Sequence, residues 1–238
     1  MKTLHVGSKL RSCVVIGTAV MVAAGVGGGL NGCASLLPAP VAAPTLYTLE
    51  ATPASAPATP LSGAVNAQSN AATTLVVNTP RADAGFDSQH IMYVREPYKL
   101  EYFAHSEWVD TPARMLTPLI VLSIARGGVF KAVVPSSIAA TGELTLDTEI
   151  VRLQQDFSSK PSRVVFTLRA HLLDTQTRKT IASRELETVV PATSDDPLGG
   201  VVAANRAVQT ALLQLAEFCA EAEKQWRATR TGAPGRTR

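Results

Sequence analysis

The sequence holds little of what nucleic-acid binding, disulfide bonding or metal binding requires. Aromatic residues make up 5% of the 238 residues, and there are only three cysteines and four histidines. Cys13 lies in an N-terminal segment typical of a leader, and Cys33 lies directly after that segment. With Cys33 modified, Cys219 alone remains a thiol, so we expect no intramolecular disulfide, even in an oxidising compartment.

Enzyme motifs are also missing. The sequence contains no G-x-S-x-G, H-E-x-x-H or C-x-x-C pattern and no phosphate-binding P-loop. The three histidines after the leader, His90, His105 and His171, lack the spacing of metal ligands, so we expect no cofactor and no metal. Glu101 and Glu107 flank His105, which leaves an envelope hydrolase as an alternative. The polar edge of a hairpin explains the same residues, so we expect no enzyme.

An excess of positive charge is absent once the leader is set apart. The formal net charge is +3, but Lys2, Lys9 and Arg11 lie in the first 32 residues, which contain no acid. The remaining 19 basic residues balance 19 acidic ones. Nucleic-acid binders normally carry a strong basic excess, so this composition argues against one.

The N-terminus carries the strongest positive signal. Its basic start is followed by Val14–Val26, a run of apolar and small residues that is long enough for a signal peptide but short for a membrane span. The sequence Leu30-Asn31-Gly32-Cys33 resembles the bacterial lipobox, with Asn31 an unusual choice. We therefore predict a lipoprotein signal peptide over residues 1–32 and lipidation of Cys33. The alternative, an uncleaved transmembrane helix, would have to include three consecutive glycines, which weaken helices.

The residue after Cys33 bears on the membrane that receives the protein. It is Ala34, whereas Asp at this place usually retains enterobacterial lipoproteins in the inner membrane. We therefore expect the periplasmic face of the outer membrane. Two or three acyl chains on Cys33 would give a durable anchor.

The remaining chain divides by composition. Residues 33–72 are rich in Ala, Pro, Ser and Thr and predict a disordered tether, interrupted by a short strand near 46–49. We predict a folded domain over 73–227, followed by a basic disordered tail over 228–238. A strand is expected at 74–77, and strands at 91–95 and 99–103 form a predicted hairpin.

Two helices and a meander are expected in the domain. Asp110 or Thr111 starts a helix that Gly127-Gly128 ends, and an amphipathic helix of about 25 residues follows Asp195 or Asp196. Between them, strands are expected at 130–134, 144–157, 164–173 and 180–190, the second with a bulge after residue 150. The predicted fold class is α+β, a mainly antiparallel sheet with two helices packed on it.

One block of the domain is similar to a known family. The residues Ile91–Arg95, Lys99–Phe103 and His105–Trp108, preceded by Tyr47-Thr48-Leu49 and followed by Asp110-Thr111-Pro112, resemble the ABC-type transport auxiliary lipoproteins, the PqiC-like family. The long Ala/Pro-rich tether departs from the family pattern.

The resemblance implies a docking role. PqiC-like lipoproteins partner MCE proteins of ABC-linked lipid transport systems on the outer-membrane side, without a catalytic step of their own. Aromatic anchors dominate interface energies, so Tyr102 and Trp108 are our candidate partner-binding residues. Trp108 could instead staple the following helix to the sheet. The resemblance leaves open a homo-oligomer, and an outer-membrane structural or assembly lipoprotein remains the alternative function.

Overall fold

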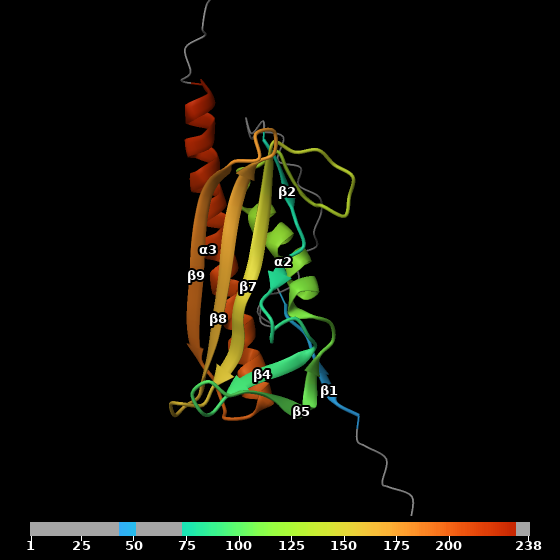
Figure 1. Ribbon diagram of the computed structural model, residues 1–238, viewed down its shortest axis with the longest axis vertical. Coiled ribbons are helices and arrows are strands. Elements are labelled where there is room, and N and C mark those ends of the chain that lie inside the picture. Colours follow the sequence, from blue (N-terminus) through green and yellow to red (C-terminus); the bar gives the residue numbers. More distant parts are fainter. Residues whose placement is uncertain (1–42, 51–72, 232–238) are drawn as a thin grey trace, which may run out of the picture. The chain divides into compact units, whose positions relative to one another are not determined.

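The computed structural model describes residues 43–50 and 73–231. The predicted signal peptide, Cys33 and most of the predicted tether lie outside the described residues. Figure 1 shows a twisted sheet with two helices, α2 (Pro112–Arg126) and α3 (Pro197–Thr231). The strands are β1 (Thr45–Tyr47), β2 (Thr74–Val77), β3 (Arg81–Ala82), β4 (His90–Val94), β5 (Leu100–Trp108), β6 (Ala132–Pro135), β7 (Leu144–Asp156), β8 (Arg163–Asp174) and β9 (Thr180–Pro191).

The long strands form the predicted meander. β7, β8 and β9 pair antiparallel, and the register of β7 shifts between Ile150 and Arg152, where the sequence predicts a bulge. Burial alternates along β7 and along the second half of β8, while residues 164–168 of β8 are buried on both sides, and one apolar face of the strands packs against the helices. The α+β class with two packed helices is confirmed.

The expectation of a mainly antiparallel sheet is wrong, because the sheet is mixed. Among the described strands, β1 pairs parallel with β5, β2 with β6 and β7, and both β3 and β4 with β7. One edge of β7 is thus shared by three short strands, while its other edge pairs with β8. A parallel neighbour needs a crossover, and between β2 and β6 the chain passes through the hairpin and α2.

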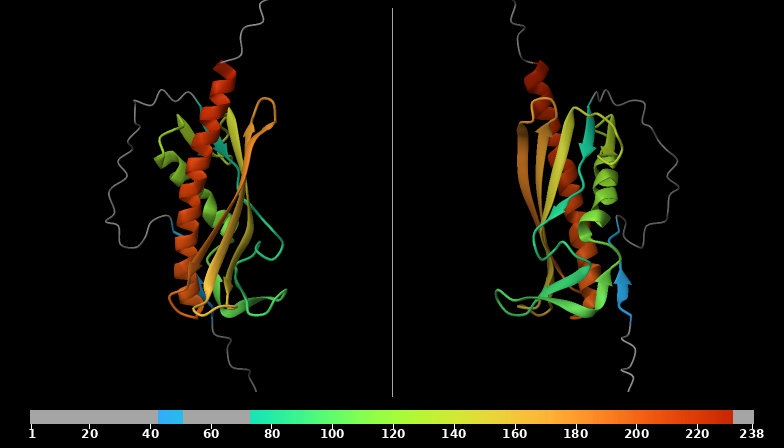
Figure 2. Two further views of the ribbon diagram at one scale, coloured as in Figure 1. Left: turned by 90° about the vertical axis from the view of Figure 1, so that its left-hand side faces the viewer. Right: turned by 45° about the vertical axis from the view of Figure 1, so that its right-hand side comes forward.

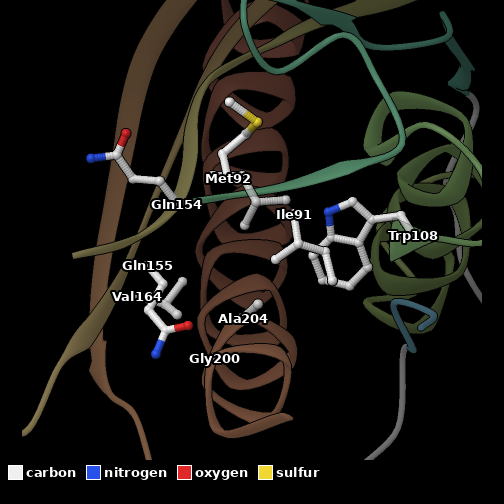
Figure 3. A pocket seen from close by; sticks show the side chains of 9 residues that line it. Ile91, Met92, Trp108, Gln154, Gln155, Val164, Gly200 and Ala204 are labelled. Carbon is white, nitrogen blue, oxygen red and sulfur yellow. The ribbon is translucent and has the colours of Figure 1, made fainter. Parts of the chain in front are cut away.

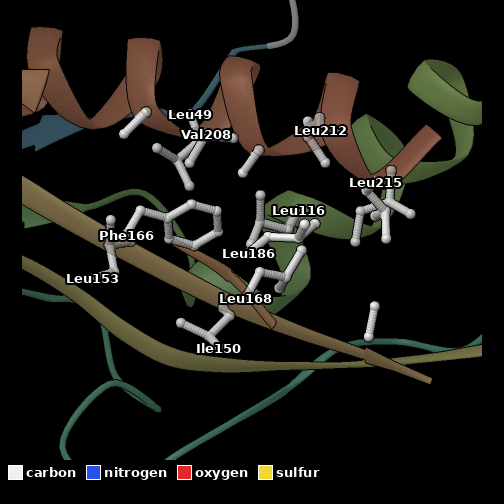
Figure 4. Packing of buried hydrophobic residues seen from close by; sticks show 14 of the residues in the cluster. Leu49, Leu116, Ile150, Leu153, Phe166, Leu168, Leu186, Val208, Leu212 and Leu215 are labelled. Atoms are coloured by element: carbon white, nitrogen blue, oxygen red, sulfur yellow. The ribbon is translucent and has the colours of Figure 1, made fainter. Parts of the chain in front are cut away.

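The core lies between the sheet and the helices. Phe166 and Leu168 of β8 meet Val208 and Leu215 of α3, with Leu116 of α2 beside them (Figure 4). Figure 2 shows α3 running along the face of the long strands. The hydroxyl of Ser123 in α2 donates to the carbonyl oxygen of Leu212 in α3 at 3.0 Å, which fixes the two helices to each other.

α3 has 35 residues and extends beyond the predicted 25 or so. Its start matches the expected cap, since the Asp196 carboxylate accepts from the backbone N–H of Gly199 at 2.7 Å. This bond lowers the pKa of Asp196. At its C-terminal end the helix continues past Arg227, the predicted end of the folded domain, to Thr231. The buried side there includes Glu223, which interrupts the apolar stripe but accepts from the Thr73 hydroxyl at 2.8 Å and pairs with Arg227.

Helix α2 starts and ends where the sequence predicts. Thr111 is the N-cap and Gly127 the C-cap, and Pro112 occupies the first turn. The Thr111 side chain makes no capping hydrogen bond; instead the Asp110 carboxylate accepts from the N–H of Thr111. Pro118 lies inside the helix without ending it.

Candidate functional site

The candidate site is the β4–β5 hairpin, which is confirmed as predicted. Val94 lies opposite Leu100, Tyr93 opposite Glu101 and Met92 opposite Tyr102. The turn closes with a backbone bond from the N–H of Lys99 to the carbonyl oxygen of Glu96, and Tyr98 has a positive φ of 66°. Further along, the register shifts so that His90 pairs with Glu107.

The outward side of the hairpin carries exposed apolar groups. We call this side the hairpin face and define it by Leu46, His90, Leu100 and Tyr102. Leu100 and Tyr102 share a side by strand alternation, His90 stacks on Tyr102, and Leu46 lies beside Glu107, the pairing partner of His90. Of these residues, 57% of Leu46, 52% of Tyr102 and 40% of Leu100 is exposed. Exposed large apolar groups that gather in this way often mark interaction surfaces.

Tyr102 is held in place. Its ring stacks on the imidazole of His90 with centroids 4.2 Å apart and an interplanar angle of 16°. The His90 Nδ1 lies 3.6 Å from Glu107 Oε1, within ion-pair range when the imidazole is protonated but beyond hydrogen-bond distance. A stacked aromatic side chain loses little rotamer freedom on binding, which suits an interface anchor.

The opposite side of the hairpin is braced by aromatic rings. Tyr93 contacts Phe103 and Phe157 with centroid distances of 4.5 and 5.8 Å. The Arg95 guanidinium lies 4.8 Å from the centroid of the Tyr93 ring, a cation–π geometry. The Glu101 carboxylate lies 3.3 Å from the ammonium of Lys99. These contacts hold the backbone of the hairpin in place beneath its outward side.

Trp108, the second candidate anchor, is buried, with 2% of its surface exposed. It packs beside Ile91 in a small pocket that Leu153 and Ala204 also line (Figure 3). This position, directly before α2, matches the alternative in which Trp108 joins the helix to the sheet. Partner binding by Tyr102 or Trp108 stays a prediction, and only Tyr102 presents a surface to solvent.

The pocket beside Trp108 is small. Its cavity volume is about 10 Å³, which is about the space that one water molecule needs. Gln155 adds one polar group: its amide nitrogen donates to the Ser162 hydroxyl at 2.9 Å, while its Oε1 is buried without a partner in the described structure.

The residues of the hydrolase alternative do not converge. His105 is exposed, and in the described part of the chain no hydrogen bond or ion pair joins it to Glu101 or Glu107. Over the same residues no group of His, Cys, Asp and Glu is arranged to hold a metal ion. Cys219 is buried, and desolvation raises the pKa of its thiol to about 12.

Sequence reasoning missed part of the hairpin face. Leu46 and His90 come from separate strands. The pairing of β4 with β5 lets His90 stack on Tyr102, and the pairing of β1 with β5 places Leu46 beside Glu107. The alternation of Leu100 and Tyr102 was a usable signal for a shared side.

None of the helices in the described ranges is long and apolar enough to span a bilayer.

Solved structures support the fold. A crystal structure of a DUF330-family protein from Xanthomonas campestris shares 21% identity, with 79% of this chain and 99% of that chain covered and a TM-score of 0.64. A second, of an uncharacterized protein, shares 12% identity over 76% of this chain and 98% of that chain, with a TM-score of 0.54. Among curated proteins none matches.

The family comparison covers most of the folded part. The model of the family described as ABC-type transport auxiliary lipoprotein component matches residues 47–216, well over half of the chain. That range starts at the last residue of β1, includes the whole hairpin and ends inside α3. The chain therefore belongs to the ABC-type transport auxiliary lipoprotein component family.

Proposed function

We propose that this protein is a periplasmic lipoprotein, anchored to the outer membrane through Cys33, that docks on an MCE protein of an ABC lipid transport system. Family membership supports the link to ABC transport. The lipobox-like Leu30–Cys33 and the following Ala34 support the anchor and its membrane. The role is one of docking, with no catalytic step and no cofactor beyond the lipid on Cys33.

The observation that carries this proposal is the exposed, prearranged hairpin face. Tyr102 presents half of its surface and is fixed by its stack on His90, while Leu100, two residues before it in β5, and Leu46, beside Glu107, are also exposed. A partner that covers Tyr102 would gain the kind of central aromatic anchor that dominates interface energies, with losses of about 2 kcal/mol or more on truncation.

The small pocket fits a docking component better than a carrier. The pocket beside Trp108, with a cavity volume of about 10 Å³, has no room for an acyl chain. The continuous apolar path would then be supplied by the MCE partner or by several chains together, and this protein would position that path at the membrane.

Site-specific crosslinking in cells tests the proposal. A photoreactive amino acid replaces Tyr102 in one strain and Leu213, which is 66% exposed on α3, in a matched control. We expect an MCE protein to be recovered from the Tyr102 strain and not from the Leu213 strain. A parallel Cys33→Ser variant should reduce the crosslink, since the anchor concentrates the domain at the membrane.

Two results would contradict the proposal. Recovery of barrel-assembly components alone from the Tyr102 strain would favour the assembly lipoprotein instead. Equal recovery of an MCE protein from both positions would show that the hairpin face is not the contact. In a binding measurement with the purified partners, Tyr102→Ala should weaken the affinity for the MCE protein about 30-fold if its loss costs about 2 kcal/mol.

A further inference from the structure

We propose that the tip of the β4–β5 hairpin, residues Arg95–Lys99, contacts the headgroup region of the bilayer that holds the lipid anchor. This inference rests on the anchor at Cys33 in the proposed function. It adds a second membrane contact, made by the folded domain itself, and so assigns an orientation to the domain at the membrane.

The tip presents an aromatic side chain without any local support. Tyr98 is fully exposed, with a relative exposure of 107%, and its φ of 66° lies in the left-handed region. That conformation costs a non-glycine residue roughly 1–2 kcal/mol. Tyrosine favours the membrane–water interface because its ring is apolar and its hydroxyl reaches water.

Further apolar and basic groups lie at the same end of the sheet. Val94 pairs with Asp156 at the end of β7, so the turn that follows, with the exposed Lys160, lies next to the tip. The N–H of Ser162 after that turn donates to Asp195, which brings the start of α3 and its exposed Leu198 to this end.

Charge is secondary in this contact. Lys99 and Lys160 could reach lipid phosphates, but Glu101 pairs with Lys99 and Asp195 lies near Lys160. Attraction to the bilayer therefore rests on Tyr98 and its apolar neighbours, and we expect it to depend only weakly on the fraction of anionic lipid.

The chain enters the domain at the other end of the hairpin from the tip. β1 pairs parallel with the last residues of β5, from Thr45 beside Ser106 to Tyr47 beside Trp108, whereas the tip precedes Leu100 at the start of β5. Figure 1 shows β1, β4 and β5 together at one end of the sheet, and the strand from Leu100 to Ser106 spans about 20 Å. Thr45 lies twelve positions after Cys33, a reach of at most about 43 Å when the chain is fully extended. A bilayer that holds Cys33 is therefore within reach of the tip.

Fluorescence on vesicles tests the contact with the lipidated mature protein. An environment-sensitive dye is placed at the tip through Glu96→Cys, which keeps Tyr98, and at the opposite end of β8 through Gln176→Cys as a control. Cys219 is buried and should not take up dye. In phosphatidylethanolamine and phosphatidylglycerol vesicles with a headgroup quencher, we expect about a twofold loss of fluorescence at Glu96→Cys and little at Gln176→Cys.

A second variant links the signal to Tyr98. Tyr98→Gly suits the positive φ, so the fold should tolerate it, and in the Glu96→Cys background it should abolish most of the quenching. Equal quenching at both dye positions, or quenching that survives Tyr98→Gly, overturns the tip contact. A protein that fails to float with the vesicles contradicts the anchor itself, and with it both proposals.

Discussion

At the scale of single residues, Asp174 joins three parts of the structure. Its carboxylate accepts from the backbone N–H of Thr177 at 2.7 Å, from the indole N–H of Trp226 at 2.9 Å and from Arg230 at 3.4 Å. These bonds, the Thr177 backbone bond first, lower the pKa of Asp174 below its ordinary value of 3.8. The ionised form is therefore the one that stabilises the fold.

Asp174→Asn should lower the free energy of unfolding by about 1–2 kcal/mol at neutral pH, because the amide offers one acceptor atom in place of two. A carboxyl whose pKa is lower in the folded state contributes stability above its unfolded pKa and loses it as pH falls through its folded pKa. The difference between wild type and variant should thus shrink below about pH 4. Urea titrations at pH 7 and pH 3 check this, with the exposed Asp87→Asn as control. A difference that stays constant over this range would contradict the role of the charge.

At the scale of elements, the first turn of α3 is packed unusually closely. A Cβ on Gly199 would clash with the backbone carbonyl of Ser194, and one on Gly200 would clash with the end of the Gln155 side chain. The glycines therefore serve close approach, where most helix positions would favour alanine.

Gly199→Ala should destabilise the protein by about 1–3 kcal/mol, although Gly→Ala usually stabilises a helix by about 1 kcal/mol. Gly200→Ala should cost less, because the Gln155 side chain can turn aside at the loss of its bond to Ser162. Thermal unfolding followed by circular dichroism ranks the two variants. A higher melting temperature for Gly199→Ala would show that the turn relaxes freely.

The elements also show where sequence reasoning succeeds. The hairpin, the meander and both helix starts were predictable because period-two alternation, turn residues and caps are local signals. The parallel pairings were not, since β1 and β3 have three and two residues and carry no register of their own. The full length of α3 was missed because Glu223 is buried by partners distant in sequence, Thr73 among them. At the candidate site, Tyr102 was accessible to sequence reasoning, whereas the burial of Trp108 depends on long-range packing.

At the scale of the whole molecule, the N-terminal strand segment is fastened to the helix at the other end of the chain. The Asn205 side chain in α3 accepts from the N–H of Glu50 at 2.7 Å and donates to the carbonyl oxygen of Thr48 at 3.2 Å. Leu49 between them is buried, with 4% exposed. The segment that leads from the predicted anchor thus belongs to the folded domain.

Asn205→Ala should loosen this segment while the sheet stays folded. A loss of about 1–2 kcal/mol would speed amide hydrogen exchange of residues 45–50 about 5- to 30-fold. Gln209→Ala is the matched control, since Gln209 reaches the Glu50 carbonyl oxygen only at 3.5 Å. Hydrogen exchange with mass spectrometry measures both. Unchanged exchange in Asn205→Ala would show that the burial of Leu49 and the pairing of β1 with β5 hold the segment without the Asn205 hydrogen bonds.

The parallel pairing of β1 with β5 also has a mechanical consequence. If Cys33 carries the proposed anchor, a load on it would enter the domain at Thr45, the first residue of β1. When that load acts along β1, the hydrogen bonds to β5 bear it together in shear, whereas a strand pulled sideways loses one bond at a time. The Asn205 bonds to Thr48 and Glu50 hold the chain directly after the strand. This three-residue strand would then be the part of the domain that resists such a load.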